Sequence, residues 1–486
     1  MEQRVSVIGA GRLGLCWALA VERAGYHVMV VDVFPTYVDA INKRTLKSTE
    51  PQVMEMLSTA RNLTATLSVA ETVAFSKYIY IFVQTPSTGG DRHYDHTHVS
   101  EVLTQLSTLK AKDKHVIVCC TVMPGYCDMV APALLSGCEN VSVSYSPEFI
   151  AQGAIIAGLV KPDMVLIGEG CKEAGDHISA LTLRYVTNCP PVHRMSAGSA
   201  EVAKLALNSF ITLKIAFGNF IGDLSDAAER ARKRAAPDDT TRDDKRKRID
   251  KMQIARAIGA DTRVGLKCLL PGYGFGGPCF PRDGRALASF ASHVSHATCP
   301  VDAELAEAPG RANASHAHSQ AQKLIASADA ALRAGAAVAT IVFDDVTFKP
   351  RCAVPIVLES QKLVVAKLVR NMSEHTVAIR SMRDDVIKAV QRDFGTLFQY
   401  WRLGEGTLPE YAPVGMEYII ADDELLPRDD DERKVYVPNN TKLEAIASGA
   451  VAYKPDEESI ALAHAGAVPD GEQRGEGRSS LPTTFN

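Results

Sequence analysis

The feature that most constrains the fold is a glycine-rich segment near the start of the chain, residues 9–14 (GAGRLG). The pattern G-x-G-x-x-G is a weak signal when it stands alone. Here an apolar strand at residues 4–8 precedes it, an apolar helix follows it, and a second strand at about 27–31 ends at Asp32. This order is typical of the first βαβ unit of a parallel sheet, so the sequence predicts a Rossmann-type, doubly wound N-terminal domain.

The same segment predicts a dinucleotide site. Gly9, Gly11 and Gly14 would allow a tight turn and let a pyrophosphate approach the helix N-terminus, while Asp32 would accept hydrogen bonds from ribose hydroxyls. The next basic residues, at 43–44, are too far along the chain to be obvious partners for a 2′-phosphate. We therefore expect NAD and not NADP; glycines that serve helix packing alone are the disfavoured alternative in this context.

Further strands are predicted at about 78–83 and 115–119, and each runs into a polar or proline-bearing loop. Loops at the carboxyl ends of such strands line the ligand crevice of a doubly wound sheet. Thr85 and Thr121 stand in these loops and are predicted to touch the cofactor.

Three histidines, His93, His96 and His98, lie between these strands. Three imidazoles are able to bind zinc, but no cysteine or carboxylate stands with them at ligand spacing. We expect solvated side chains and no metal.

Another strand ends at residues 146–149 (SPEF), where Glu148 stands beside apolar neighbours. A carboxyl group in such surroundings has a raised pKa that suits a general base, although a surface glutamate is the simpler interpretation.

A strong helical pattern follows at 198–226. Lys204 and Asn208 share one face of that helix, close to Glu201 and among apolar residues, so a buried pair would form an oxyanion clamp.

The loop at residues 274–283 (GFGGPCFPRD) contains three glycines, two prolines and Cys279. The glycines let the backbone approach a ligand and the prolines stiffen the segment. A lone cysteine is most often a small buried apolar residue. In this loop, with Asp283 four residues on, we interpret Cys279 as a positioned thiol.

Composition limits the other possibilities. A chain of 486 residues with 46% hydrophobic residues has room for about three domains. The net charge of -4 gives no basic field for nucleic acid. Eleven cysteines in no regular spacing, a start without a leader pattern and no run of eighteen apolar residues favour a reduced, cytoplasmic protein that does not enter a membrane.

In this order the motifs resemble the nucleotide-sugar 6-dehydrogenase family, over residues 1 to about 320. The resemblance implies a four-electron oxidation of a sugar C6 alcohol to a carboxylate by two molecules of NAD. UDP-glucose is the expected substrate and GDP-mannose the alternative, because the segment 146–149 fits these two better than the Cys-Pro-Glu-Arg type of enzymes for N-acetylated sugars. The motifs that carry it are the glycine turn with Asp32, residues 83–86 (VQTP), 120–122 (CTV), 146–149 (SPEF), 200–204 (AEVAK) with Asn208, 261–265 (DTRVG) and 274–283.

The resemblance also implies residue roles. Cys279 would form a thiohemiacetal and then a thioester, with Lys204 and Asn208 stabilising the oxyanions. Asp283 and Thr121 would hold the water, Glu148 would act as the base during hydrolysis, and Lys204 is expected to lower the pKa of the thiol. The residues implied to contact the substrate are Phe149, Lys204, Asn208, Arg263, Tyr273, Gly276 and Lys349. Arg263 matches a position that binds substrate across a subunit contact, which implies a homo-oligomer, a dimer or higher.

Several positions depart from the family pattern. Gln152 stands where a second glutamate is common, which removes a counter-charge near the nicotinamide. Residues 229–250 form a strongly charged insertion, for which we predict a solvated loop; a nuclear address or a polyanion patch is the alternative.

The predicted organisation is a Rossmann domain at 1–195, a central long-helix domain with the Cys279 loop at 196–330, and a divergent, second Rossmann-like α/β domain at 331–468, followed by a disordered tail at 469–486. In the C-terminal domain we predict strands from about 336, at 376–380 and near 417–420 and 434–437, with helices at 356–373 and 384–394. This domain lacks the usual arginine segment; Lys349 remains, and Arg351 is a possible substitute. A catalytically weak nucleotide-binding scaffold is therefore the alternative function.

Overall fold

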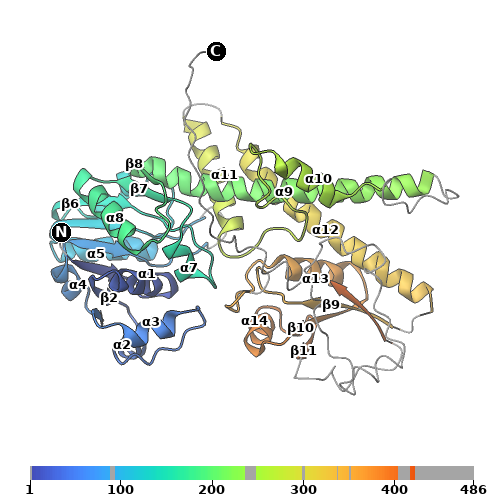
Figure 1. Ribbon diagram of the computed structural model, residues 1–486, viewed down its shortest axis with the longest axis horizontal. Helices are drawn as coiled ribbons and strands as arrows, with labels where there is room; N and C mark the ends of the chain where they lie inside the picture. Colours follow the sequence, from blue (N-terminus) through green and yellow to red (C-terminus); the bar gives the residue numbers. More distant parts are fainter. Residues whose placement is uncertain are drawn as a thin grey trace, which may run out of the picture. The chain divides into compact units, whose positions relative to one another are not determined.

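The computed structural model describes residues 3–87, 93–235, 248–297, 301–335, 338–349, 352–402 and 416–421. Within these residues the chain forms two mainly parallel sheets, separated in sequence by long helices (Figure 1). The strand at 434–437, the tail at 469–486 and Arg351 lie outside the described residues.

The first sheet has eight strands in the order β3-β2-β1-β4-β5-β6-β7-β8. Its order reverses between β1 and β4, which is the switch point where ligands bind in doubly wound sheets. The β6–β7 pair is antiparallel and every other pair is parallel. The strands are β1 (Arg4–Ile8), β2 (His27–Val31), β3 (Leu63–Thr66), β4 (Tyr78–Ile81), β5 (Lys112–Val118), β6 (Glu139–Tyr145), β7 (Val165–Glu169) and β8 (Val192–Ser196).

Helices cover both faces of this sheet (Figure 1). They are α1 (Arg12–Arg23), α2 (Pro35–Asn42), α3 (Val53–Thr59), α4 (Val69–Phe75), α5 (Thr97–Thr108), the π-helix η1 (Tyr126–Val130), α6 (Ala131–Leu134), α7 (Ile155–Val160) and α8 (Lys172–Tyr185). A strand covered on both faces needs apolar residues at successive positions and not only at alternate ones. This explains the apolar runs from which the Rossmann-type prediction was made, and that prediction is confirmed.

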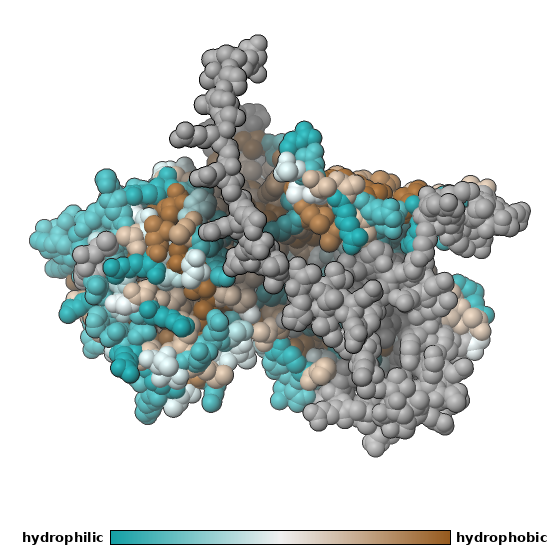
Figure 2. All heavy atoms as spheres, viewed as in Figure 1, coloured by the Kyte–Doolittle hydropathy of each residue, from teal (hydrophilic) through white to brown (hydrophobic). Residues whose placement is uncertain are grey.

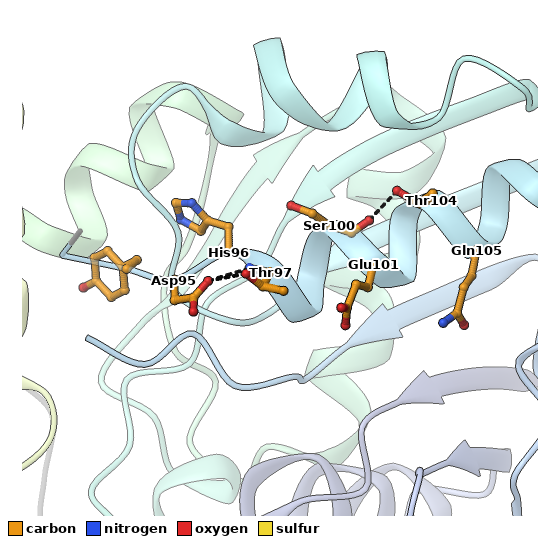
Figure 3. Close-up of a pocket in the computed structure, with 8 residues that line it drawn as sticks. Asp95, His96, Thr97, Ser100, Glu101, Thr104 and Gln105 are labelled. Atoms are coloured by element: carbon orange, nitrogen blue, oxygen red, sulfur yellow. Dashed lines mark hydrogen bonds between the residues drawn. The ribbon is translucent and has the colours of Figure 1, made fainter. Parts of the chain in front are cut away.

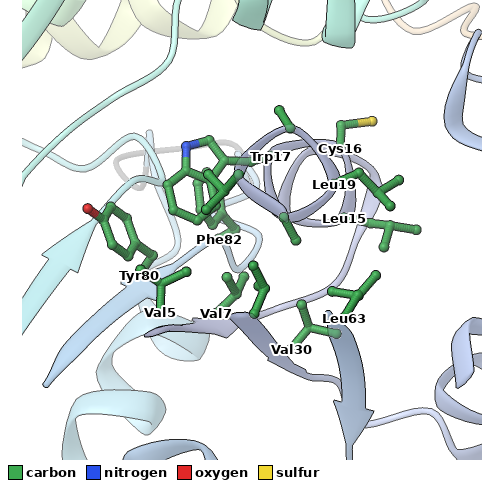
Figure 4. Close-up of a cluster of buried hydrophobic side chains, with 14 of the residues drawn as sticks. Val5, Val7, Leu15, Cys16, Trp17, Leu19, Val30, Leu63, Tyr80 and Phe82 are labelled. Carbon is green, nitrogen blue, oxygen red and sulfur yellow. The ribbon is translucent and has the colours of Figure 1, made fainter. Parts of the chain in front are cut away.

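The core on one face lies between the sheet and α1 (Figure 4). Val5 and Val7 of β1 meet Trp17 of α1, and the Trp17 ring lies 4.4 Å from the ring of Tyr80 and 5.3 Å from that of Phe82. This packing fixes the start of α1, and therefore the glycine turn, against the ends of β1 and β4.

The long helix α9 (Ala197–Ala235) begins where β8 ends and packs against α10 (Lys251–Ala260), α11 (Phe280–Ala297) and α12 (Glu304–Arg333). It is longer than the predicted 198–226, so the predicted loop at 229–250 is wrong for its first seven residues. Glu229 keeps the helix going, because it pairs with Arg232 one turn later and accepts a hydrogen bond from the Ile249 backbone. Residues 236–247 of the insertion lie outside the described residues, and residues 248–250 form the non-helical lead into α10.

By length and composition α9 would be able to cross a membrane. The face that carries Glu201, Lys204 and Asn208 is buried against protein, however, and these three side chains are less than a tenth exposed. Core helices of water-soluble proteins share this character.

The second sheet is parallel, in the order β11-β10-β9-β12. It consists of β9 (Val338–Asp344), β10 (Thr376–Ser381), β11 (Gln399–Arg402) and β12 (Met416–Ala421), and it packs with α12, α13 (Gln361–Met372) and α14 (Asp384–Phe394). The second α/β unit is thus confirmed. Helix α13 starts five residues later than predicted, because residues 352–360 form a turn instead of a first helical segment. In this turn the Phe348 N–H donates to the Ile356 carbonyl, and the Ser360 hydroxyl donates to the Thr347 carbonyl.

Candidate active site

The glycine turn after β1 has the geometry of a ligand cradle. A β-carbon added to Gly9, whose φ is +97°, would lie 2.7 Å from the carbonyl oxygen of Phe82, and one added to Gly14 would lie 2.0 Å from that of Gly9. These two glycines are therefore required by packing. Around a β-carbon at Gly11, by contrast, no described atom lies within 4 Å. Gly11 is the N-cap of α1, so an anionic group has open access to the first amides of the helix.

Asp32 is held beside this cradle at the end of β2. Its carboxylate accepts hydrogen bonds from the backbone N–H groups of Ala10 (3.1 Å) and Phe34 (3.3 Å). Val33 and Phe34 are exposed next to it. A carboxylate with exposed apolar side chains beside it is compatible with the adenosine that was predicted to bind here.

Gln152 lies against the same turn. The Arg12 guanidinium donates a 2.7 Å hydrogen bond to Gln152 Oε1. The amide thus keeps an acceptor at this position although it lacks the charge of the glutamate that the family pattern has there. The backbone N–H of the next residue, Gly153, donates to Glu50.

Cys279 lies just before α11, with Asp283 in the first turn of that helix, where the Asp283 N–H donates to the Cys279 carbonyl (2.8 Å). The Asp283 carboxylate is 1% exposed, and both of its oxygens accept hydrogen bonds. One oxygen accepts from Asn208 Nδ2 of α9 (2.6 Å), and the other accepts from the Tyr94 hydroxyl (2.6 Å) and from Arg282 Nε (3.1 Å). Three segments far apart in the sequence therefore meet at one carboxylate.

Lys204 lies one turn before Asn208 and is also buried. Its ammonium donates a 2.6 Å hydrogen bond to the backbone carbonyl of Glu148 and lies 4.2 Å from the centre of the Phe149 ring. The predicted burial of Lys204 and Asn208 on one helix face is confirmed. Glu201 has a different task, because it accepts hydrogen bonds from the N–H groups of Gly125 and Cys127 and so fixes the loop after β5.

Burial sets the ionisation of this cluster. It raises the pKa of Glu148 to about 7, against a smaller opposing effect of Lys204. It also lowers the pKa of Lys204, although Asp283, Cys279 and Glu148 act in the opposite direction. The raised pKa expected for Glu148 is confirmed.

The expectation for the Cys279 thiol is wrong in its net direction. Arg282 and Lys204 do lower its pKa, but desolvation by burial is the larger effect, so the pKa of the thiol is raised. Asp283 adds to the rise.

The two threonines lie at the same edge of the sheet. Thr85 is buried, and its carbonyl accepts a hydrogen bond from Arg282 (3.2 Å). Thr121 is half-buried in the loop after β5.

The loop that carries Cys279 is fitted closely to residues 348–359. A β-carbon on Gly276 would lie 2.1 Å from the carbonyl oxygen of Glu359, and one on Gly277, at φ +83°, would lie 2.4 Å from the Phe348 ring. Lys349 follows, with its ammonium 5.7 Å from the same ring. Lys349 thus stands next to a residue that contacts the Cys279 loop, and its predicted contact with the substrate stays a prediction.

Two other predicted substrate residues are placed differently. Tyr273 begins the loop, and its ring lies 5.6 Å from the Lys362 ammonium. Arg263 lies in the turn after α10, where its exposed guanidinium pairs with Asp261 at 2.7 Å. Within a single chain Arg263 is thus not part of the buried cluster around Asp283.

Sequence reasoning missed Tyr94 and Arg282. Arg282 stands inside the loop motif 274–283, which was the available signal. Tyr94 offered none, because it stands in a polar segment 189 residues from Asp283. The Tyr94 ring lies under the Arg282 guanidinium (4.7 Å).

The nearby histidines have separate partners. His96 accepts a hydrogen bond from the Met123 N–H (3.2 Å), whereas His98 lies 3.5 Å from Glu101. Among the residues that the structure describes, no three His, Cys, Asp or Glu side chains are arranged to hold a metal ion.

A hollow of about 830 Å³ runs along α5 (Figure 3). The described residues that line it all come from the single stretch 94–105, and Thr97, Ser100, Glu101, Thr104 and Gln105 follow one another along α5 in Figure 3. It is an open groove along one helix, and Tyr94, which lines it, also reaches Asp283.

The glycine turn with Asp32 beside it, at the switch point of a doubly wound sheet, is the arrangement of a dinucleotide-binding Rossmann-type domain. Residues 3–184 match the NAD binding domain of the UDP-glucose/GDP-mannose dehydrogenase family, and residues 244–314 match its central domain. The chain belongs to this family, and its cofactor is NAD.

Known relatives carry two substrate names. The chain is 29% identical over 302 residues to UDP-glucose 6-dehydrogenase of Pseudomonas aeruginosa, a match that covers 60% of this chain but only 62% of that enzyme. It is 28% identical over 327 residues to GDP-mannose 6-dehydrogenase of Pseudomonas savastanoi pv. phaseolicola, covering 64% and 68% of the two chains. A solved UDP-glucose dehydrogenase from Pyrobaculum islandicum aligns with a TM-score of 0.68 and 25% identity, over 82% of this chain and 85% of that one.

Proposed function

We propose that this protein is an NAD-dependent nucleotide-sugar 6-dehydrogenase that oxidises a sugar C6 alcohol to the carboxylate, with UDP-glucose as its substrate. The observation that carries the proposal is a buried cluster of four residues. Asp283 lies one helical turn from Cys279 and accepts a hydrogen bond from Asn208, which itself lies one turn from Lys204. A single oxidation to an aldehyde would not need a thiol in this position. Oxidation of the aldehyde to the acid requires a tetrahedral carbon that can lose a second hydride. A thiolate that adds to the aldehyde makes its carbon tetrahedral.

NAD, when bound at the glycine turn, supplies the hydride acceptor for both oxidations. The chain's own residues do the rest. The Cys279 sulfur adds to the aldehyde carbon, and the carbonyl oxygen becomes an oxyanion. Lys204 has three N–H donors and gives one to Glu148, while Asn208 Nδ2 has two and gives one to Asp283. The remaining donors stabilise the oxyanion of the thiohemiacetal.

The opposite pKa shifts of the thiol and the amine support this assignment. Burial raises the pKa of Cys279 and lowers that of Lys204, which brings the two values closer together. Lys204 in its neutral form is thus a suitable acceptor for the thiol proton before the sulfur attacks.

Hydrolysis of the thioester completes the cycle. Glu148, with a pKa near 7, is ionised in part at neutral pH and takes a proton from the attacking water. Asp283 and Thr121 hold that water, and the Cys279 thiolate leaves as the acid forms.

The choice of sugar nucleotide is a separate part of the proposal. UDP-glucose is favoured and GDP-mannose is the alternative, in line with the two named relatives. Lys349, next to the Cys279 loop, is proposed to bind the diphosphate, and Phe149, Tyr273 and Gly276 to contact the sugar nucleotide. With one lysine in place of an arginine segment, we expect weak selection between nucleotides.

We further propose a homo-oligomer in the cytosol. Apolar side chains gather along α9 (Figure 2), and Phe210, Phe217, Phe220 and Leu224 are each about half exposed. Their spacing places them along one side of the helix, and an apolar stripe of this kind favours self-association. Arg263 would then complete the site of a neighbouring subunit.

The ten cysteines that the structure describes are all free thiols, which supports a reducing compartment.

Incubation of the purified protein with NAD and each nucleotide sugar tests the proposal. We expect two moles of NADH per mole of UDP-glucose and the uronic acid as product. Binding of NAD without NADH formation from any nucleotide sugar would favour the non-catalytic scaffold. Two moles of NADH per mole of GDP-mannose, with none from UDP-glucose, would show that GDP-mannose is the substrate and would still agree with the proposed mechanism.

A further inference from the structure

A second group of reactive side chains lies in the NAD-binding domain, away from Cys279. Strand β7 runs antiparallel to β6. The chain therefore leaves β7 in the direction of the N-terminal halves of β5 and β6, away from the cofactor loops at their carboxyl ends. Cys171, just after β7, there meets His115 of β5 and Ser142 of β6, which are direct neighbours in the sheet register.

Cys171 is the N-cap of α8, a helix of 14 residues, and its sulfur accepts a hydrogen bond from the Ala174 N–H (3.5 Å). The same sulfur lies 3.5 Å from the Ser142 hydroxyl and 3.6 Å from His115 Nδ1. The sulfur therefore has a backbone donor on one side and, on the other, an imidazole nitrogen that can take its proton.

The imidazole of His115 is built into the protein and is 8% exposed. Nδ1 lies 2.6 Å from the Ser142 hydroxyl. On the other side Nε2 lies 3.3 Å from a carboxylate oxygen of Glu173, out of hydrogen-bond alignment, and has no hydrogen-bond partner among the described residues. Glu173 also pairs with Lys77 (2.6 Å), and the Tyr78 ring stacks on the imidazole at 5.3 Å.

The charge balance around His115 suits a base. Burial and the Lys77 ammonium lower its pKa, while Glu173 acts in the opposite direction. The ring is therefore neutral at physiological pH and able to accept a proton at Nδ1, and the Glu173 carboxylate is close enough to stabilise the imidazolium that results.

We propose that Cys171, with His115 as its base and Glu173 as the counter-charge, is a second reactive thiol of this protein and is modified by low-molecular-weight disulfides such as glutathione disulfide. The Cys171 proton passes to His115 Nδ1, and the sulfur attacks one sulfur of the disulfide. The S–S bond of the reagent breaks as the new S–S bond forms, and the leaving thiolate takes the proton from His115. The products are a mixed disulfide at Cys171 and one free thiol.

The same chain provides matched controls. Cys189 and Cys268 are exposed, whereas Cys171 is half-buried. If exposure alone decided reactivity, Cys189 and Cys268 would react before Cys171. The arrangement around Cys171 predicts the reverse order.

The test treats the full-length protein with excess glutathione disulfide and follows each cysteine-containing peptide by mass spectrometry. We expect Cys171 to be modified at least about tenfold faster than Cys189 and Cys268. In Glu173→Gln, a change at a half-exposed side chain, and in His115→Gln, Cys171 should slow by about tenfold while Cys189 keeps its rate.

A variant in which the buried Cys16 and Cys119 stay unmodified is folded, and Glu173→Gln keeps the test usable if His115→Gln does not fold. Equal rates at Cys171 and Cys189 in the unmodified protein would overturn the proposal. An undiminished Cys171 rate in either folded variant would do so as well.

Discussion

Replacing Tyr94 by phenylalanine removes one oxygen from the centre of the proposed active site. The Tyr94 hydroxyl donates a 2.6 Å hydrogen bond to Asp283, and the side chain is 4% exposed. The phenylalanine ring keeps the packing and the contact with the Arg282 guanidinium. The substitution therefore tests the hydrogen bond to Asp283 and little else.

The size of the effect follows from the partners. A hydrogen bond to a charged group contributes about 1.5–3 kcal/mol. Arg282 still donates to the same oxygen at 3.1 Å and Asn208 to the other at 2.6 Å, so the carboxylate is not left without partners. We expect a loss near the lower end, about 1.5–2 kcal/mol, which is a 10- to 30-fold lower rate for the step in which Asp283 positions water.

The assay combines steady-state and single-turnover kinetics. In Tyr94→Phe, NADH should form in a burst, because both oxidations precede hydrolysis, and the acylated Cys279 should accumulate and be visible as added mass on the protein. The kcat should fall by the stated factor and the KM for the nucleotide sugar should fall with it, because a step that follows both oxidations does not enter kcat/KM.

Tyr126→Phe is the matched control. Tyr126 is 3% exposed and its hydroxyl lies 2.8 Å from that of Ser100, so this change also removes one buried hydroxyl. It should cost about 1 kcal/mol of stability and leave kcat within twofold. A Tyr94→Phe enzyme with the same kcat as Tyr126→Phe, and no trapped acyl group, would refute a role of Tyr94 in hydrolysis.

Three further predictions concern single residues. Cys279→Ser should lower uronic acid formation by several orders of magnitude, since a serine hydroxyl is a far weaker acid than a thiol and is hardly ever ionised, while NAD still binds; near wild-type turnover would argue against the thioester. Asp32→Ala should weaken NAD binding about tenfold by titration calorimetry, because alanine cannot accept hydrogen bonds from the ribose hydroxyls, and a wild-type preference for NADP would contradict the assignment. Because the pKa of Glu148 is raised to about 7 and the base must be ionised, kcat should fall as the pH drops below about 7, and Glu148→Gln should lack this titration; an unchanged profile in the variant would assign it to another group.

Local patterns were enough to predict the elements around the cofactor. Strands β1 and β2 have the predicted bounds, 4–8 and 27–31, because buried parallel strands leave a continuous apolar run bounded by glycine and aspartate. At Gly9 and at Gly14 a close backbone contact excludes a β-carbon, so the spacing of these two glycines predicts the tight turn between β1 and α1.

Contacts between distant segments could not be predicted in this way. Tyr94 reaches Asp283 across 189 residues of sequence, and nothing in its neighbours marks it. The same limit explains the error for Cys279. A nearby lysine is visible as a helix-face pattern, whereas the depth of burial, which outweighs it, depends on packing by several segments.

The extension of α9 to Ala235 also depended on a distant contact. Glu229 accepts a hydrogen bond from Ile249, beyond the charged insertion, and composition alone favoured a loop there.

The hydrogen bonds between Asn313 and Phe275 have a consequence for the range of sequences that this site tolerates. The Asn313 amide accepts from the Phe275 N–H and donates to the Phe275 carbonyl, both at 2.9 Å, so α12 recognises the main chain of the loop and not the side chain at 275. A β-carbon on Gly274 would lie 1.9 Å from the Asn313 oxygen. In a library of variants, position 275 should accept other buried apolar residues, whereas Gly274 should accept none. Asn313 should reject even aspartate, which can accept like the amide but, when ionised, cannot donate.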